Sequence, residues 1–279
     1  MAARSRPGMT GGVAVLGALA LVLALYGVAL GGLWWGQEKL LFMPDRLAQD
    51  HVLAKAEDIH EIRIPVDGAE LSALHLRRPD PAGVVFFLHG NAGSLESWFV
   101  NPDFYRRANY DLFMLDYRGY GKSGGTITSE AQLHADVRAA WDSIAARYAG
   151  RKRVLYGRSL GSGLAARLAV DLPAAQAPHL TVLVSPYRSI AALTEQHYPW
   201  VPQALLRYPM RTDTWIGRIP NRLLLIHGEQ DTLIAPEHSH ALKALAPQAE
   251  LLLVPGAGHN DLQQFPVYLD GLARALAGL

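Results

Sequence analysis

An uncharged stretch near the N-terminus constrains the fold of this chain more than any other feature. No charged residue occurs from Pro7 to Gln37, and residues 13–35 are almost entirely apolar. A helix of this length crosses the hydrocarbon core of a bilayer, whereas a helix buried in a soluble core is rarely so long and so uniformly apolar. We therefore expect residues 13–35 to span a membrane and contact its lipid, followed by a juxtamembrane connector over residues 37–55.

The charges that flank this stretch predict its orientation. Arg4 and Arg6 precede it, while Glu38 and Lys39 cancel each other after it. The positive-inside rule then makes residues 1–36 a cytoplasmic tip and signal anchor, with the rest of the chain on the extracytoplasmic side, which is the periplasm in a bacterium. A cleaved signal peptide is the alternative, but the apolar stretch exceeds the usual length of its hydrophobic region.

The remaining residues, 56–279, alternate short apolar runs with segments of helical length. Two strand-like runs are joined by a turn at residues 65–68, which predicts a hairpin. Further runs are apolar throughout, as in strands covered on both faces. The hairpin strands are expected at 59–64 and 71–76, and the buried strands at 84–88, 112–115, 154–156, 180–184, 223–226 and 251–254. This alternation predicts an α/β fold, a mostly parallel sheet with helices on both sides that binds ligands at the carboxyl ends of its strands.

Composition removes several classes of function. Half of the 279 residues are apolar, which is enough for one large core but cramped for two domains. The net charge is +1 and no basic run or stripe stands out, so nucleic-acid binding is not expected. The chain has no cysteine. Disulfides, thiol nucleophiles and cysteine-based metal sites are therefore excluded.

The segment YGRSLGSG, residues 156–163, predicts a serine nucleophile. Gly157, Ser159 and Gly161 have the G-x-S-x-G spacing of a nucleophile elbow, in which a strand turns so sharply into a helix that the serine side chain stands above the sheet. A Cβ at either glycine would clash across this turn, and Gly163 lies where the helix must pack close to neighbouring strands. Ser159 is then expected to be a covalent catalyst.

A serine hydroxyl needs a base to take its proton, and the base needs a carboxylate that orients it. His259 and Asp231 each follow an expected strand downstream of Ser159. The chain order serine, aspartate, histidine is the order found in hydrolases with a nucleophile elbow. Glu229 and Asp261 compete with Asp231 for the role of the carboxylate.

Two other histidines, His89 and His227, also lie at strand ends. Each precedes a glycine, and we expect each to anchor its loop through hydrogen bonds rather than to act as the base.

Negative charge that develops on a carbonyl oxygen also needs hydrogen-bond donors, usually two backbone N–H groups. Leu160, directly after the nucleophile, supplies one. The segment HGNAG, residues 89–93, follows an expected strand and supplies the second, from Asn91 or, as the alternative, from Ala92. The competing interpretation is that HGNAG is only a glycine-rich turn.

Residues 116–124, DYRGYGKSG, alternate glycines with a lysine and a serine. Their spacing does not match that of a phosphate-binding P-loop. We expect a structural loop in which Asp116 and Arg118 pair near the rim of the site.

Six segments, in this order and at these spacings, carry a resemblance to a known family: LHGNAGS, DYRGYGKSGG, YGRSLGSG, SPYRSI, HGEQDTLI and GAGHND. From about Gln37 to the C-terminus the chain resembles the membrane-anchored α/β-hydrolase family of serine-aminopeptidase-like fold, whose relatives include eukaryotic depalmitoylating and lipid-hydrolysing enzymes. The resemblance implies an eight-stranded sheet, a triad carried onto Ser159, His259 and Asp231, and no cofactor.

Residues 187–220 lie where many such hydrolases insert a cap, and they are rich in aromatic residues. This predicts a small lid that lines an apolar acyl pocket, unless the aromatics merely pack over the sheet. An anchored hydrolase with such a lid would meet acyl chains from the bilayer, so we expect it to cleave carboxylic esters or thioesters through an acyl-enzyme. The alternatives are a peptidase or amidase of the same fold, or an idle scaffold that binds a lipid or protein partner.

Overall fold

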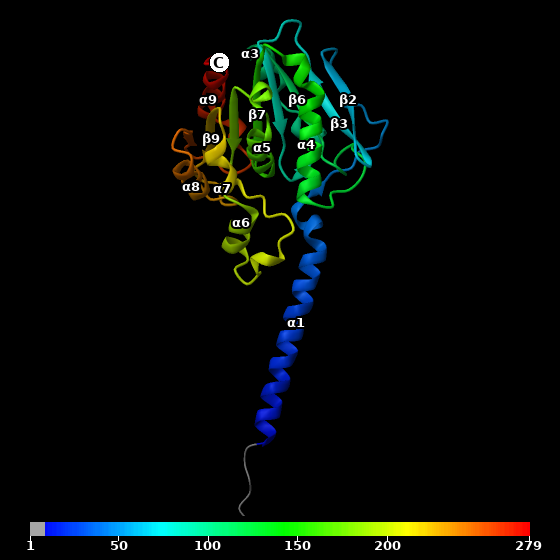
Figure 1. Cartoon of the computed structure of the whole chain (residues 1–279), viewed down its shortest axis with the longest axis vertical. Coiled ribbons are helices and arrows are strands. Elements are labelled where there is room, and N and C mark those ends of the chain that lie inside the picture. The colour runs from blue at the N-terminus through cyan, green and yellow to red at the C-terminus, as the bar shows by residue number, and fades with distance from the viewer. Residues whose placement is uncertain (1–8) are drawn as a thin grey trace, which may run out of the picture.

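A long helix projects from a sheet-based domain in the computed structural model, which describes residues 9–279 (Figure 1). This helix, α1 (Met9–Leu41), continues beyond the apolar stretch at 13–35. Among the described residues it is the one helix long and apolar enough to cross a membrane, over Gly12–Leu41 with a hydropathy of 2.6. Arg4 and Arg6, on which the predicted orientation rests, lie outside the described residues.

The domain is built on an eight-stranded sheet of order β10-β9-β8-β7-β4-β6-β3-β2. The strands are β2 (Ile59–Val66), β3 (Ala69–Leu76), β4 (Gly83–Leu88), β6 (Tyr110–Leu115), β7 (Lys152–Arg158), β8 (Leu180–Val184), β9 (Arg222–Gly228) and β10 (Glu250–Val254). The β2–β3 hairpin and the β3–β6 pair are antiparallel, and all other pairs are parallel. Each strand predicted from an apolar run is confirmed.

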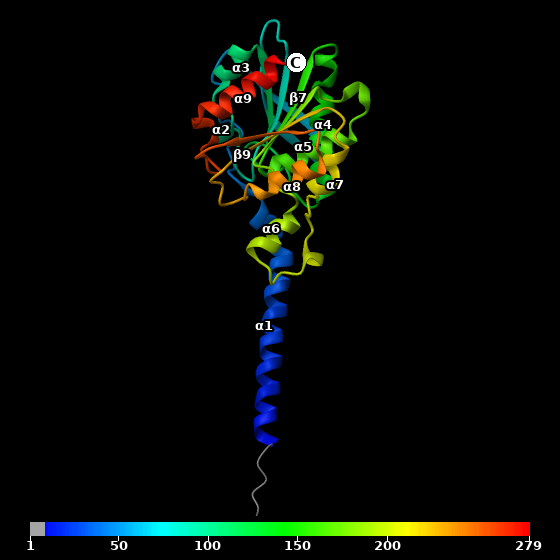
Figure 2. The same ribbon diagram turned by 90° about the vertical axis from the view of Figure 1, so that its left-hand side faces the viewer.

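Helices cover both faces of this sheet (Figures 1 and 2). On one face α4 (Glu130–Ala145), α5 (Leu160–Asp171), α7 (Thr212–Trp215) and α8 (Glu237–Leu245) contribute to one buried apolar cluster. On the other, α3 (Pro102–Ala108) and α9 (Pro266–Ala277) contribute to a second. Shorter helices are α2 (Leu95–Trp98), α6 (Ile190–His197), η1 (Ala146–Tyr148), η2 (Ala174–Gln176), η3 (Gln203–Leu205), η4 (Ile216–Arg218) and η5 (Leu262–Gln264). This is the predicted layered α/β architecture.

The chain that leaves α1 joins the domain at a short parallel strand pair. β1 (Met43–Pro44) pairs with β5 (Ala92–Gly93), which lies within the loop after β4. The amide of Asp45 extends this pairing by donating to the carbonyl of Gly93 at 2.9 Å. Helix α1 therefore ends directly on the HGNAG loop, at the edge of the sheet where the parallel strands end.

The segment at 187–220, expected to form a lid, holds α6, η3, α7 and η4. Both views place α6 and the loop that follows it beside the end of α1 nearest the sheet (Figures 1 and 2). This segment is here called the lid. Its part around α6 lies beside the helix expected to cross the membrane, whereas α7 packs on a face of the sheet.

Candidate active site

The sharp turn at Ser159 has the geometry predicted for a nucleophile elbow. β7 ends at Arg158 and α5 begins at Leu160, so that Ser159 alone connects strand and helix. Its φ of 51° and ψ of −120° fall in a region that residues other than glycine rarely adopt. The amide of Ser159 donates to the carbonyl of Val184 in β8 at 2.9 Å, which helps to hold this conformation.

The glycines around Ser159 meet the steric demand that the sequence predicted. A Cβ at Gly157 would lie 2.3 Å from the carbonyl oxygen of Gly161, and a Cβ at Gly161 would lie 2.1 Å from that of Leu88. At Gly163 the close neighbour is the hydroxyl of Tyr187, 2.3 Å from an added Cβ, rather than a strand as expected. The helix after the nucleophile therefore packs against the first residue of the lid.

The structure brings Ser159, His259 and Asp231 together. His259 Nε2 lies 3.1 Å from Ser159 Oγ, and His259 Nδ1 lies 2.7 Å from Asp231 Oδ2. Because an ionised carboxylate can only accept, Nδ1 carries the proton and Nε2 is free to accept one from the serine. Of the competing carboxylates, Asp261 accepts instead from the amide of Gly258 at 2.8 Å, and Glu229 is exposed.

Asp231 is held in its ionised form. Its second oxygen, Oδ1, accepts from the amides of Leu233 and Ile234 at 3.0 and 2.8 Å. Burial by itself would raise the pKa of Asp231, but hydrogen bonds from His227 and His259 outweigh that effect and hold the pKa well below its usual range. A carboxylate in this state fixes the orientation of His259 and stabilises the cation that forms when His259 takes a proton.

His227 supports this carboxylate, a role that sequence reasoning missed. Its Nε2 lies 2.7 Å from the carbonyl of Ile234 and 3.4 Å from Asp231 Oδ2, and its Nδ1 lies 2.6 Å from the hydroxyl of Ser239. A carbonyl only accepts, so Nε2 carries the proton and the Ser239 hydroxyl donates to Nδ1. His227 therefore anchors its loop, as predicted. Its position four residues before Asp231, within HGEQD, is the sequence feature that could have indicated its contact with Asp231.

The backbone amides of Leu160 and Asn91 are the predicted donors to an oxyanion. Leu160 is the first residue of α5, where helix N–H groups have no partner within the helix. Asn91 lies in the HGNAG loop, and a Cβ added to the adjacent Gly90 would lie 3.6 Å from the Cβ of Ser159. Within residues 9–279, neither the Leu160 nor the Asn91 amide donates a hydrogen bond. Both amides therefore lack a hydrogen-bond partner among the described residues, and their role at an oxyanion stays a prediction.

The Asn91 carbonyl is fixed from two directions that the sequence did not reveal. It accepts from the amide of Met43, the first residue of β1, at 2.8 Å. It also accepts from the hydroxyl of Tyr120, in the DYRGYGKSG loop, at 2.6 Å. The Asn91 carbonyl shares a planar peptide group with the amide of Ala92, so these two bonds fix that peptide and restrict rotation of the HGNAG loop.

The predicted pairing of Asp116 with Arg118 is wrong. Arg118 instead donates to both oxygens of Asp136 in α4, at 2.5 and 2.9 Å. Asp116 points inward, where it accepts from the amide of Leu95 at 2.9 Å and lies 3.4 Å from Nε2 of His89. Burial raises the pKa of Asp116.

His89 lies in the interior next to this carboxyl group. Its Nδ1 lies 2.8 Å from the carbonyl of Gly90. It anchors the HGNAG loop, as predicted.

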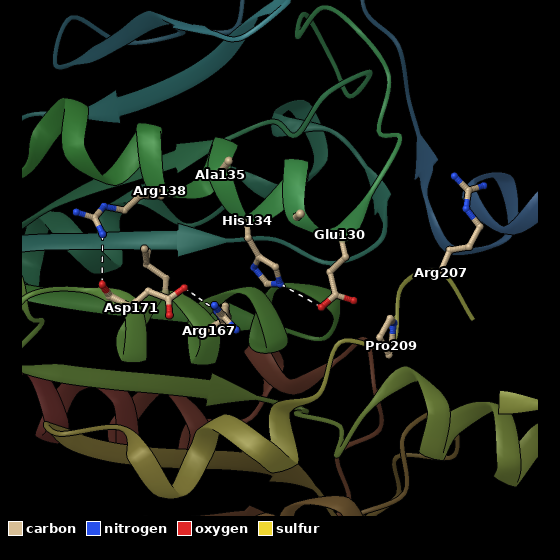
Figure 3. A pocket seen from close by; sticks show the side chains of 10 residues that line it. Glu130, His134, Ala135, Arg138, Arg167, Asp171, Arg207 and Pro209 are labelled. Carbon is tan, nitrogen blue, oxygen red and sulfur yellow. Dashed lines mark hydrogen bonds and ion pairs between the residues drawn. The ribbon is translucent and has the colours of Figure 1, made fainter. Parts of the chain in front are cut away.

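A hollow of about 610 Å³ lies between α4 and α5, away from the triad (Figure 3). Its charged side chains are paired within it or at its rim: Arg167 donates to Asp171 at 2.6 Å, and His134 lies 3.4 Å from Glu130. Its lining offers no nucleophile and little uncompensated charge. Across residues 9–279, no group of three or more potential metal ligands is present.

Comparison with known proteins identifies relatives that match about three quarters of the chain. The family described as serine aminopeptidase, S33, matches residues 79–212, a range that includes Ser159. The chain is 32% identical over 212 residues to alpha/beta hydrolase domain-containing protein 17B of Homo sapiens, covering 74% of this chain and 70% of that protein. It is 30% identical over 227 residues to protein 17C of Xenopus tropicalis, covering 75% and 67%.

Solved structures share the fold at lower identity. A Pyrococcus furiosus esterase superposes with a TM-score of 0.66 at 22% identity, covering 85% of this chain and 98% of the esterase. A soluble variant of the monoglyceride lipase of Saccharomyces cerevisiae superposes with a TM-score of 0.61 at 18% identity, covering 81% and 97%. These structures have the α/β-hydrolase fold, and so does this chain.

Proposed function

This chain belongs to the family of alpha/beta hydrolase domain-containing proteins 17, and we propose that it is a membrane-anchored serine hydrolase that cleaves carboxylic esters or thioesters through an acyl-enzyme. One observation carries the proposal. Ser159, His259 and Asp231 form a continuous hydrogen-bonded chain at the elbow, with His259 Nε2 placed to accept the serine proton. Each of these three side chains has the position and the hydrogen-bond partner that its role in a catalytic triad requires.

The reaction follows from these contacts. Ser159 Oγ attacks the acyl carbonyl carbon while its proton moves to His259 Nε2, and Asp231 stabilises the resulting imidazolium. The amides of Asn91 and Leu160 donate to the oxygen of the tetrahedral intermediate. His259 then returns the proton to the departing alcohol or thiol, leaving an ester on Ser159. Water, activated by the same histidine, releases the acid and restores the serine.

The choice of acyl esters over peptides rests on the surroundings of the triad. An apolar helix suited to a bilayer ends on the loop that bears Asn91, and the lid beside that helix exposes Tyr198 and Trp200 by 58% and 49%. Such surroundings favour an apolar substrate group over a hydrated peptide. With residues 1–36 as cytoplasmic tip and anchor, the domain at 56–279 would act on the extracytoplasmic side.

Hydrolysis of p-nitrophenyl esters of graded chain length by the full-length protein tests this function. Ser159→Ala should lower kcat by about 10³- to 10⁶-fold, because nothing else at the elbow can form the acyl-enzyme. Ser143→Ala, a serine of α4 outside the triad, should retain activity. Turnover of amides without turnover of any ester would refute the substrate class, and full activity of Ser159→Ala would refute the mechanism.

A further inference from the structure

A largely apolar cavity of about 310 Å³ lies between α1 and the lid. One wall consists of four residues of α1, and the other is formed by α6 and the loop after it. The lining is Leu33, Gln37, Leu40, Leu41, Ile190, Thr194, Tyr198, Trp200, Val201, Leu205 and Leu206. The helix expected to anchor the protein is thus also one wall of a cavity within the size range of ligand sites.

Polar contacts hold the lid against α1 over a considerable length of the helix. The hydroxyl of Tyr26 donates to the carbonyl of Trp200 at 2.8 Å. Further along, the Gln37 side chain donates to the carbonyl of Leu205 and accepts from the amide of Arg207, both at 2.8 Å. About 16 Å of helix separate Tyr26 from Gln37, at a rise of about 1.5 Å per residue.

A second cluster of contacts closes the end of the cavity near the sheet. The hydroxyl of Tyr208 donates to Glu38 at 2.7 Å, and Arg207 forms an ion pair with the same carboxylate at 2.7 Å. The guanidinium of Arg207 also lies 5.3 Å from the ring centroid of Trp34. The lid and the end of α1 are thus joined by charge, hydrogen bonds and aromatic contact.

These contacts set the depth of the lid in a bilayer. If residues 13–35 span the membrane, Tyr26 lies within the hydrocarbon region, and the part of the lid bonded to it lies in the same leaflet. The rings of Tyr198 and Trp200, which are 58% and 49% exposed, present apolar surface that can contact lipid at this depth. The cavity between them and α1 then borders lipid rather than bulk water.

We infer that this cavity binds the acyl chain of the substrate, which enters sideways from the bilayer. The inference rests on the proposed function and adds that the anchor helix forms half of the acyl site. Most of the lining is apolar, with polar groups only on Gln37, Thr194, Tyr198 and Trp200, and both polar ends of the Gln37 side chain are already bonded. A hydrocarbon chain fits such a lining, whereas a polar ligand would leave its hydrogen-bonding groups without partners.

Each wall of the cavity is joined through the chain to a residue that contacts the catalytic edge of the sheet. Leu41 lies two residues before Met43, whose amide holds the carbonyl of Asn91. On the other wall, Ile190 follows β8 by a short loop, and β8 ends at Val184, which accepts the amide of Ser159. An acyl chain lying between these walls would therefore point its carbonyl end toward the serine.

Substitutions that fill the cavity from each wall test this inference in the full-length protein. Leu33→Trp and Thr194→Trp should each lower kcat/KM for p-nitrophenyl palmitate by about ten-fold or more, because added bulk excludes a long chain. p-Nitrophenyl acetate, too short to need the cavity, should be hydrolysed within about two-fold of the wild-type rate. The matched control Val28→Trp, on a residue of α1 that is 74% exposed and outside the cavity, should change neither rate.

The outcomes separate this inference from the proposed function. Equal loss of both esters, or unchanged palmitate hydrolysis in both cavity variants, would overturn the acyl site while leaving the hydrolase in place. Failure of the wild-type protein to cleave any ester would instead refute the proposed function.

A second readout does not depend on turnover. A phospholipid with a photoactivatable acyl chain, in vesicles containing the protein, should crosslink to peptides of both α1 and α6, and less so in Leu33→Trp. Crosslinks evenly distributed around α1, with none to the lid, would overturn the inference. Crosslinks between two copies of the chain at this cavity, in place of crosslinks to lipid, would overturn the inference as well.

Discussion

The catalytic edge of the sheet and the junction of the lid with α1 are built in different ways. At the catalytic edge, Ser159, Asp231 and His259 each follow the end of a parallel strand. Because parallel strands end at the same edge of the sheet, the three residues lie along that edge. At the junction, the partners come from opposite parts of the chain, 168 to 174 positions apart. Strand order dictates the first arrangement, whereas tertiary packing alone creates the second.

This difference indicates a division of labour. The catalytic edge provides chemistry that many substrates could share, because a triad and two amides recognise only the reacting acyl group. In the proposed acyl site, the junction would surround the part of the substrate that does not react. Binding energy from that remote part distinguishes one substrate from another. The comparison therefore predicts that changes at the catalytic edge affect all esters, and that changes at the junction affect long chains selectively.

The largest effect short of removing Ser159 is expected from Asp231→Asn. The amide side chain no longer stabilises the His259 cation and favours the wrong tautomer, so kcat should fall by about 10⁴-fold for short and long esters alike. Asp261→Asn, which alters only the competing carboxylate bonded to Gly258, should retain most activity. Steady-state kinetics on both esters would measure this, and a larger loss in the Asp261 variant would reverse the assignment.

A smaller effect is expected from Tyr120→Phe, where the two regions meet. The variant loses the hydrogen bond to the Asn91 carbonyl while Met43 still holds it, so kcat should fall by about ten-fold with KM little changed. Tyr110→Phe removes a similar bond, to the carbonyl of Leu276, far from the triad. Both variants should lose about 1 kcal/mol of unfolding free energy.

Only the Tyr120 variant should lose activity. Equal kcat values in Tyr120→Phe and Tyr110→Phe, at equal thermal stability, would mean that the bond to Asn91 has no influence on the oxyanion donors.

The smallest effect is expected from Tyr208→Phe at the junction. Loss of the bond to Glu38 loosens the lid, while the ion pair with Arg207 remains, so hydrolysis of the palmitate ester should fall by about two- to five-fold and that of the acetate ester should not change. Tyr110→Phe, whose bond to the carbonyl of Leu276 lies outside the junction, serves again as the control. A drop for both esters would show that the junction acts on the chemistry and not on chain length, which would erase the contrast between the two regions.

Much of the fold and of the catalytic edge could be predicted because their signals are local. Apolar runs marked the strands, and the glycines at 157 and 161 marked the elbow through a steric need that the structure reproduces. The HGNAG motif marked the loop after β4, where a Cβ added to Gly90 would lie 3.6 Å from the Cβ of Ser159.

The remaining features depend on contacts that no local pattern encodes. The bond from Met43 to Asn91 depends on where α1 ends, and the contact from Tyr26 to Trp200 depends on how the lid folds back. Arg118 was assigned to its neighbour Asp116 because sequence proximity suggested it, whereas α4 brings Asp136 closer in space. Long-range partners of this kind become visible only once the sheet is assembled.

The central claim is that Ser159 is the nucleophile of an intact hydrolase site. The most direct measurement treats the full-length protein with a fluorophosphonate, digests it and locates the adduct by mass spectrometry. The account predicts one modified residue, Ser159, and no adduct in Ser159→Ala. An adduct on another serine, or labelling that survives the substitution, would contradict it.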